Sequence, residues 1–384
     1  MERGAFAGEP WKGRLLLLCP LAFLGAFCYT TVRPTASLYA RQLGLSYAQV
    51  GVLGFAMGLM QTISAMPLGR LSDRIGKAST ILMALSGMSA SCALFPLAMD
   101  YPALLAISIL LGLSGGGWWP SIASAFGAAA PPRRRGFAMG LYSASFGSAY
   151  AIGPFLGGLA ISLSGYPAAF ALCLAAGTLG AALSALMRRG EGPMGRGGHM
   201  APGGLGDARS LSASCAGGYA NGVLMGFLFT IFPVYLKALG FLESQIGAIV
   251  MAFGIARTAT FLKAGGLADK HGHSKIAALG LAIAAIASTA IGISGSGIGV
   301  WPSSILLGLA MGLIFPSLTA MAAGGGSGFR MGIFETAVGV GLFSGPLVGG
   351  YLADAIAPEA SLYFCALISL ASLAAVSALS RLRI

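Results

Sequence analysis

The stretch GRLSDRIGK at residues 69–77 decides the fold, because it returns as GGLADKHGH at residues 265–273. The two copies align without a gap, so that Asp73 and Asp269 lie 196 residues apart. Identical residues at the same offset include Tyr39 and Tyr235, Gln49 and Gln245, and Pro120 and Pro316. Because chance does not hold one register over this length, the chain is an internal duplication, and each half is one structural unit.

The duplication continues past the middle of each half with a slightly shorter offset. GFAMG at residues 136–140 meets GFRMG at 328–332, 192 residues later. The pattern Gly-Pro-x-x-Gly-Gly occurs at residues 153–158 and again at 345–350 in the same register. A motif of small residues that is present in both halves is typical of closely packed helices.

The composition predicts a membrane protein. Of the 384 residues, 56% are apolar and only 9% are charged, which would leave a soluble protein without a polar surface. A bilayer removes that need, and each transmembrane helix requires about 20 apolar residues. The uncharged stretches, divided at two Gly-containing breaks (164–167 and 294–297), predict helices at 15–40, 47–68, 79–98, 102–126, 137–163, 168–187, 211–236, 245–264, 276–295, 301–322, 332–354 and 361–380.

We therefore expect an all-α membrane protein with 12 transmembrane helices in two pseudo-symmetric six-helix bundles. Residues 1–187 form the first bundle, 188–209 a Gly-rich cytoplasmic linker, and 210–384 the second bundle. Of the 23 lysines and arginines, only Arg41 and Lys237 fall in loops on one side of the predicted membrane, and nearly all others fall in loops on the opposite side. Because cations accumulate in cytoplasmic loops, both termini are expected inside, in a multi-pass protein of the cytoplasmic membrane.

With these motifs in place, the whole chain resembles a transporter of the major facilitator superfamily, and most of all its 12-helix efflux members for drugs and other small molecules. Both copies of the signature segment between the second and third helices of each half carry the resemblance. The resemblance implies a gating role for Gly69, Asp73, Arg74 and Gly76 and for Gly265, Asp269, Lys270 and Gly272. It also implies one for Gly153 and Pro154, which match a motif of the family's exporters except that Ala149 replaces the opening glycine.

Away from the ends of the predicted spans, three charged residues lie inside them: Arg33, Arg257 and Glu335. An intramembrane cation costs about 2.5–3.5 kcal/mol, so each should face a partner or a watery cavity. The predicted depths of Arg257 and Glu335 differ by about 5 Å, which predicts an ion pair. Alternatively, Glu335 titrates during transport as the coupling residue, or Arg257 contacts the substrate. Arg33 has no acidic mate, and it either lines a cavity or snorkels to the outer interface.

Polar and aromatic residues near the middle of the spans are the remaining candidates for substrate binding, against the alternative that they are core or lipid-facing. The candidate substrate-binding residues are Tyr29, Arg33, Trp118, Trp119, Asn221, Phe229 and Arg257.

The resemblance implies alternating access around a site near the bilayer midplane. We expect a monomeric secondary transporter in the lipid bilayer that exports a drug-like or amphipathic compound, with protons as the candidate coupling ion. One alternative is an importer or exchanger of a small organic anion, and another is a membrane sensor that does not transport. No residues converge into a catalytic or metal site, and neither an enzyme, a cofactor nor nucleic-acid binding is expected.

Overall fold

The computed structural model describes residues 10–131, 134–190, 208–295, 297–323 and 328–381, and the regular structure of these residues is entirely helical. The elements are α1 (Pro10–Gln42), α2 (Tyr47–Ile75), α3 (Lys77–Leu94), the short 3-10 helix η1 (Phe95–Leu97), α4 (Tyr101–Ala129), α5 (Arg135–Ser164), α6 (Tyr166–Gly190), α7 (Ala208–Ala238), α8 (Glu243–His271), α9 (His273–Ile293), α10 (Val300–Ala323), α11 (Gly328–Ala355) and α12 (Ala360–Arg381).

All twelve α-helices are long and apolar enough to cross a bilayer, which confirms the predicted spans. Residues 191–207, most of the predicted linker, lie outside the described residues.

Two helix ends differ from the prediction by more than all the others. We expected α2 to end near residue 68 and α8 near residue 264, but the helices continue to Ile75 and His271. The charged residues of the signature segments therefore lie on the last turns of these long helices. Asp, Arg and Lys end the apolar stretch, but they do not end the helix itself. The chain turns only at Gly76 and Gly272, whose φ angles of 93° and 94° favour glycine.

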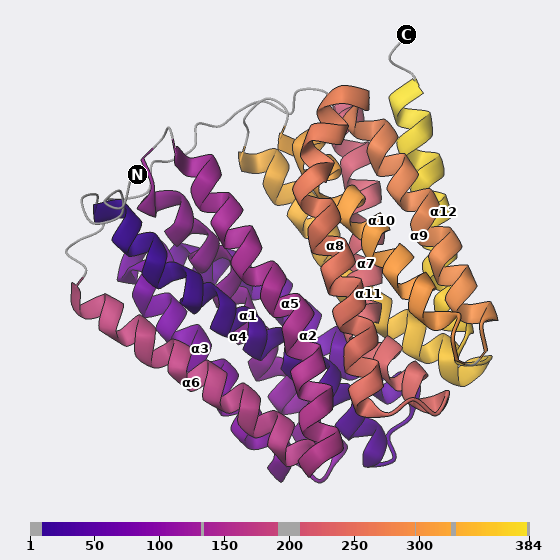
Figure 1. Cartoon of the computed structure of the whole chain (residues 1–384), viewed down its shortest axis with the longest axis horizontal. Coiled ribbons are helices and arrows are strands. Elements are labelled where there is room, and N and C mark those ends of the chain that lie inside the picture. Colours follow the sequence, from indigo (N-terminus) through magenta and orange to yellow (C-terminus); the bar gives the residue numbers. More distant parts are fainter. Residues whose placement is uncertain (1–9, 132–133, 191–207, 296, 324–327, 382–384) are drawn as a thin grey trace, which may run out of the picture.

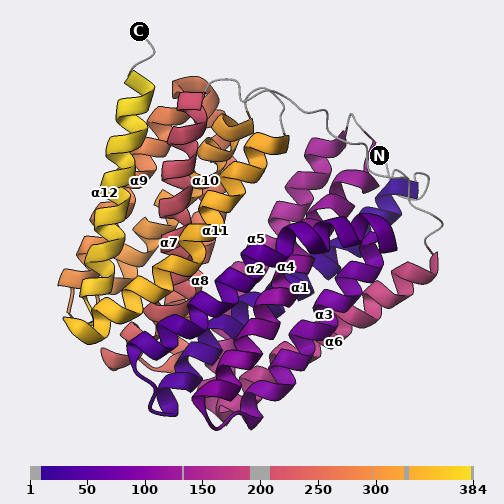
Figure 2. The same cartoon turned by 180° about the vertical axis from the view of Figure 1, so that it is seen from behind.

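The helices form two bundles, α1–α6 and α7–α12, coloured indigo to magenta and pink to yellow in Figure 1. The bundles converge at one end of the molecule and diverge toward the end where α1 begins and α12 ends, as both views show (Figures 1 and 2). We call these the closed end and the open end. Between the bundles, α5 packs on α8 and α2 packs on α11.

Two pseudo-symmetric glycine seams make the contacts of the closed half. In the α5–α8 seam, a Cβ on Gly158 would collide with the carbonyl oxygen of Glu243, and one on Gly147 would collide with Thr258. The α2–α11 seam repeats this at the offsets read from the sequence. There, Gly350 meets the carbonyl oxygen of Tyr47, and Gly339 meets Thr62.

Toward the open end the seams stop. A Cβ on Gly69, Gly140, Gly265 or Gly332 would have no heavy atom within 4 Å. These glycines lie on the same four helices that form the seams. The bundles are thus in contact over the closed half and separate over the other half.

Candidate functional site

Six side chains from five helices form what we call the arginine-aromatic cluster, where the two bundles face each other. The members are Tyr29 and Arg33 on α1, Trp119 on α4, Tyr150 on α5, Phe229 on α7 and Arg257 on α8. Ring contacts join Tyr29 to Trp119, Trp119 to Tyr150 and Tyr150 to Phe229, with centroids 6.2, 6.2 and 5.4 Å apart. The sequence predicted five of the six and missed Tyr150, although it directly follows Ala149 of the exporter motif.

Arg33 lies in the protein interior and does not reach the outer interface. Its side chain is buried, and its guanidinium carbon lies 5.6 Å from the ring centroids of both Tyr29 and Phe229. Phe229 is the residue that the 196-residue offset relates to Arg33. Because equivalent residues that touch must lie near the axis relating the two bundles, this contact marks the centre of the interface. This burial contradicts the snorkelling alternative, and the lining of a cavity by Arg33 stays a prediction.

Arg257 occupies the inner end of the α5–α8 seam. It is buried, and its guanidinium carbon lies 5.5 Å from the ring centroid of Tyr150. It lines a small hollow together with Ser143 and Phe146 of α5. Tyr150 also contacts the ring of Phe229, over which Arg33 lies, so these two rings connect the two cations.

The predicted ion pair between Arg257 and Glu335 is wrong: within the described part of the chain, neither residue forms an ion pair. Glu335 is exposed on α11, one turn beyond Gly339 and thus at the end of the α2–α11 seam. Arg257 belongs to the other seam. Although their predicted depths differ by only about 5 Å, the two side chains lie on different sides of the interface, because α8 packs against α5 and α11 packs against α2.

The remaining predicted binding residues differ in their surroundings. Trp118 is completely buried and packs inside the first bundle against Gly25 of α1, and its ring touches the cluster only from behind, through an edge contact with Trp119 at 4.5 Å between centroids. Trp119, the next residue, is only partly buried and contacts Phe146 as well as Tyr29. Asn221 on α7 is buried, and its Oδ1 atom has no donor in the described structure.

The phenol of Tyr29 donates a hydrogen bond to Gln61 Oε1 on α2. Gln61 is the residue that the 196-residue offset relates to Arg257. The same position thus holds a neutral, hydrogen-bonded amide in the first bundle and a cation in the second, which makes the cluster asymmetric and positive.

The signature segments make few contacts in this conformation. Asp73, Arg74 and Lys270 are exposed, and the one ion-pair contact of Asp269 among the described residues is with His273, at 3.5 Å, when that histidine is protonated. These residues lie at the open end, where the bundles are apart. Gly153 packs within its own bundle against Thr30 and Thr31, whereas the carbonyl oxygen of Pro154 lies in the α5–α8 seam against Gly247.

Polar contacts that the sequence reasoning missed hold the closed end together. The Asp354 carboxylate at the end of α11 accepts hydrogen bonds from the backbone N–H groups of Tyr47 and Ala48, at 3.0 and 2.7 Å. These groups belong to the first turn of α2 in the other bundle. A carboxylate satisfies such free N–H groups and interacts favourably with the helix dipole.

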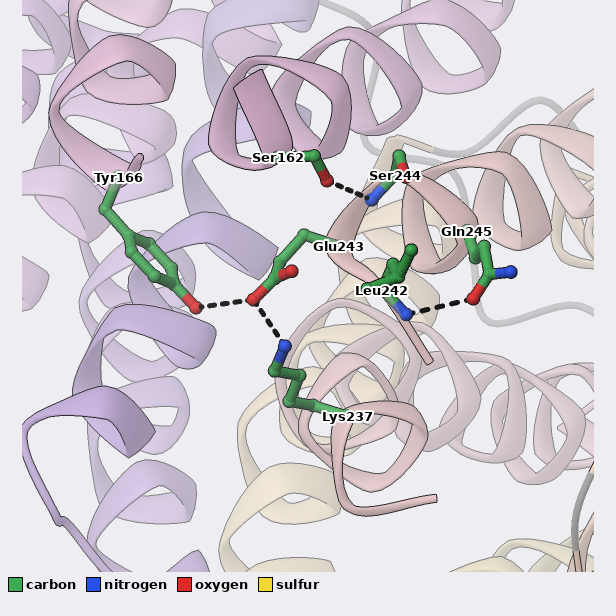
Figure 3. A network of polar contacts seen from close by, with 7 residues as sticks. All are labelled: Ser162, Tyr166, Lys237, Leu242, Glu243, Ser244 and Gln245. Carbon is green, nitrogen blue, oxygen red and sulfur yellow. Dashed lines mark hydrogen bonds and ion pairs between the residues drawn. The ribbon is translucent and has the colours of Figure 1, made fainter. Parts of the chain in front are cut away.

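The pseudo-symmetric partner of this contact lies between α5 and α8 (Figure 3). Ser162 Oγ accepts a hydrogen bond from the Ser244 N–H at 3.0 Å. Ser162 and Asp354 are related by the 192-residue offset, and Ser244 and Ala48 by the 196-residue offset. Each bundle therefore caps a helix of the other, and the two offsets, read together, contained the signal for this pairing.

An ion pair adds to the closed end on the α5–α8 side. Lys237 Nζ lies 2.7 Å from Glu243 Oε1, and the Tyr166 hydroxyl donates to the same oxygen at 3.4 Å (Figure 3). Glu243 and Ser244, the first two residues of α8, are thereby held to the first bundle by Tyr166 and Ser162, while Lys237 pairs with Glu243 inside the second bundle. A cavity of about 350 Å³ lies beside this network, lined by Arg41 and by these residues among others.

Two related six-helix bundles, packed on each other at one end and enclosing a polar and aromatic cluster at mid-span, define a membrane transporter. The profile of the Major Facilitator Superfamily matches residues 18–323 and, in an overlapping match, residues 214–383. The chain belongs to the Major Facilitator Superfamily, whose members are transporters.

Known relatives agree with this assignment. An uncharacterized MFS-type transporter of Methanocaldococcus jannaschii is 23% identical over 351 residues, which cover 88% of this chain and 91% of the relative. A multi-drug resistance efflux pump PmrA homolog of Lactococcus lactis is 24% identical over 379 residues, 92% of this chain and 91% of the relative. A bacterial homolog of the human lysosomal transporter Spinster, in an inward-facing and occupied conformation, superposes with a TM-score of 0.84 at 15% identity and covers 98% of each chain.

Proposed function

We propose that this protein is a secondary active transporter of the cytoplasmic membrane that exports small amphipathic organic compounds by alternating access. The observation that carries the proposal is the one-sided closure of two equivalent bundles. The four helices α2, α5, α8 and α11 are in close contact over one half of their length and apart over the other half. Tilting the bundles about the central cluster would close one end and open the other.

We further propose that the open end faces the cytoplasm, with both chain termini on that side. Lysines and arginines at the ends of α2 and α8 lie there, including Arg70, Arg74, Lys263 and Lys270. The bias of cations toward the cytoplasm supports this orientation. The conformation is then inward-facing, as is the bacterial homolog of Spinster.

Export is supported by the name of the Lactococcus relative, a multi-drug resistance efflux pump homolog, and by the exporter motif around Pro154. The aromatic rings of the cluster suit a flat, apolar solute body. Glu335 supports proton coupling: within the described spans it is the only acidic residue far from a helix end, and it is exposed toward the open end. Import or exchange of a small organic anion is the second candidate, favoured by Arg33 and Arg257.

The proposal is tested in everted membrane vesicles with an imposed pH gradient, acidic inside, and a lipophilic fluorescent dye as solute. We expect accumulation of the dye that depends on the gradient. Glu335→Gln should abolish the dependence of dye accumulation on the gradient. The control is Glu359→Gln, at the residue just before α12, and this variant should keep that dependence. Loss of dye from preloaded vesicles under the same gradient would reverse the proposed direction.

Alternating access is tested by locking the closed end. Ser162→Cys with Ser244→Cys places two thiols across the bundle interface, in a background where the partly exposed Cys19 and Cys215 are alanine. Oxidation should stop transport, and a reductant should restore it. The control pair Ser184→Cys with Ala78→Cys joins two helices of the same bundle and should leave transport unchanged. Undiminished transport by the locked protein would exclude the mechanism.

A further inference from the structure

We propose that the arginine-aromatic cluster binds the negatively charged group of an amphipathic organic anion, so that aromatic anions are the solutes of this transporter. This inference rests on the proposed transport function and narrows it, because it assigns a negative charge to the solute and names the residues that bind the charged group. The argument begins with the two guanidiniums.

Arg33 and Arg257 are buried cations with unused hydrogen-bond donors. Arg33 is 4% exposed and Arg257 is 8% exposed. Nε and Nη2 of Arg33, and Nε of Arg257, have no hydrogen-bond acceptor, and neither residue forms an ion pair in the part of the chain that the structure describes. Taking a charge out of water without a partner costs several kcal/mol. An anion that enters between them would supply both the charge and the missing acceptors.

A third arginine that is buried in the described part of the chain shows what a structural role looks like. Arg330 on α11 is equally buried, but its Nε donates to the carbonyl oxygen of Ala322 at 3.0 Å, at the end of α10. It thus satisfies a free carbonyl group of a helix terminus. Among the residues that the structure describes, Arg33 and Arg257 have no comparable carbonyl partner and instead lie over aromatic rings.

The two cations belong to different bundles, and each contacts a ring of the opposite one. Arg33 of the first bundle lies over Phe229 of the second, and Arg257 of the second lies over Tyr150 of the first. An anion held by both would therefore bridge the bundles at the axis that relates them. Its binding energy would depend on how the bundles are tilted, which is the requirement for a transported solute.

The chemistry of the neighbours defines the class of anion. A guanidinium is planar and presents paired donors that match a carboxylate, sulfonate or phosphate group. Trp119 and Phe146 lie edge to face, 5.9 Å between centroids, next to Tyr150. These rings offer an apolar wall to a flat body attached to the anionic group. A small inorganic anion would leave the wall unused, whereas an aromatic carboxylate or an anionic lipid would use both features.

The test measures binding to the purified full-length protein, by tryptophan fluorescence, of three probes that share one ring system. They are 2-naphthoate, 2-naphthylmethanol and 2-naphthylmethylammonium. We expect naphthoate to bind at least about tenfold more tightly than the other two, as two charge-assisted hydrogen bonds require. Arg33→Gln or Arg257→Gln should remove that preference, and Arg257→Lys should restore it in part.

Lys263→Gln, which removes an exposed charge two turns further along α8, is the matched control and should leave naphthoate binding unchanged. A second arm compares lysophosphatidylglycerol with lysophosphatidylcholine, and shows whether the anion comes from lipid or from solution. Equal affinity for the three naphthyl probes, or unchanged naphthoate binding in both arginine variants when thermal unfolding shows them to be folded, would overturn the inference.

Vesicle transport then separates this inference from the proposed function. Accumulation of neutral and cationic dyes that Arg257→Gln leaves intact would retain the transporter and reject the anion site. Arginine-dependent naphthoate binding without uptake in either direction would retain the site and reject the transporter.

Discussion

Replacing Asp354 by alanine should shift the two bundles toward the arrangement that opens the closed end. The substitution removes the acceptor for the N–H groups of Tyr47 and Ala48 across the bundle interface. Loss of an N-cap acceptor costs about 0.5–2 kcal/mol. Because Asp354 is solvent-exposed, we take about 1 kcal/mol, which corresponds to about a fivefold change in the ratio of the two arrangements.

The shift is measured as a distance distribution between spin labels on the closed end. Met99→Cys before α4 and Ile298→Cys before α10 are suitable sites, since both are strongly exposed and lie in different bundles. Cys19 and Cys215, which are partly exposed, are replaced by alanine so that they do not react. We expect the population with the longer label distance to increase about fivefold in Asp354→Ala.

Asp100→Ala is the matched control. Asp100 accepts from the Ala103 N–H at 2.9 Å and caps α4 within its own bundle at the same end of the molecule. Its removal should lower the thermal stability by a similar free energy and leave the label distances unchanged. Equal distance distributions in Asp354→Ala and the parent protein, or an equal shift in Asp100→Ala, would refute the reasoning.

Two further predictions concern the seams and the cluster. Gly158→Ala places a Cβ against the carbonyl oxygen of Glu243 and should destabilise the closed-end arrangement by about 1–3 kcal/mol. We expect the same change in label distances as for Asp354→Ala. The control Gly140→Ala, whose added Cβ has no heavy atom within 4 Å, should leave the label distances unchanged. Arg257→Gln should raise the thermal unfolding midpoint of the ligand-free protein by a few degrees, because it removes an unpaired buried charge. The midpoint is measured by differential scanning calorimetry. A lower midpoint than in the parent protein would contradict the idea that Arg257 is unpaired in the empty site.

The sequence alone determined the duplication, the twelve spans and the family, because these depend on composition and on register along one chain. The same register relates Gly158 to Gly350 and Ser162 to Asp354, so the pseudo-symmetry of the seams and caps was already encoded there. The sequence also singled out Arg33 and Arg257, since an arginine in an apolar stretch can be recognised without a structure.

Only the tertiary structure decided which of these side chains meet. Counting residues gives the depth of a side chain along a helix, but it does not give the direction in which the helix turns that side chain. For that reason the pairing of Arg257 with Glu335 was wrong, and of the adjacent Trp118 and Trp119 the first is fully buried against α1 whereas the second contacts Tyr29 in the cluster. The contact of Asp354 with Tyr47 joins residues more than three hundred positions apart, and it exists only because α11 and α2 lie side by side across the bundle interface.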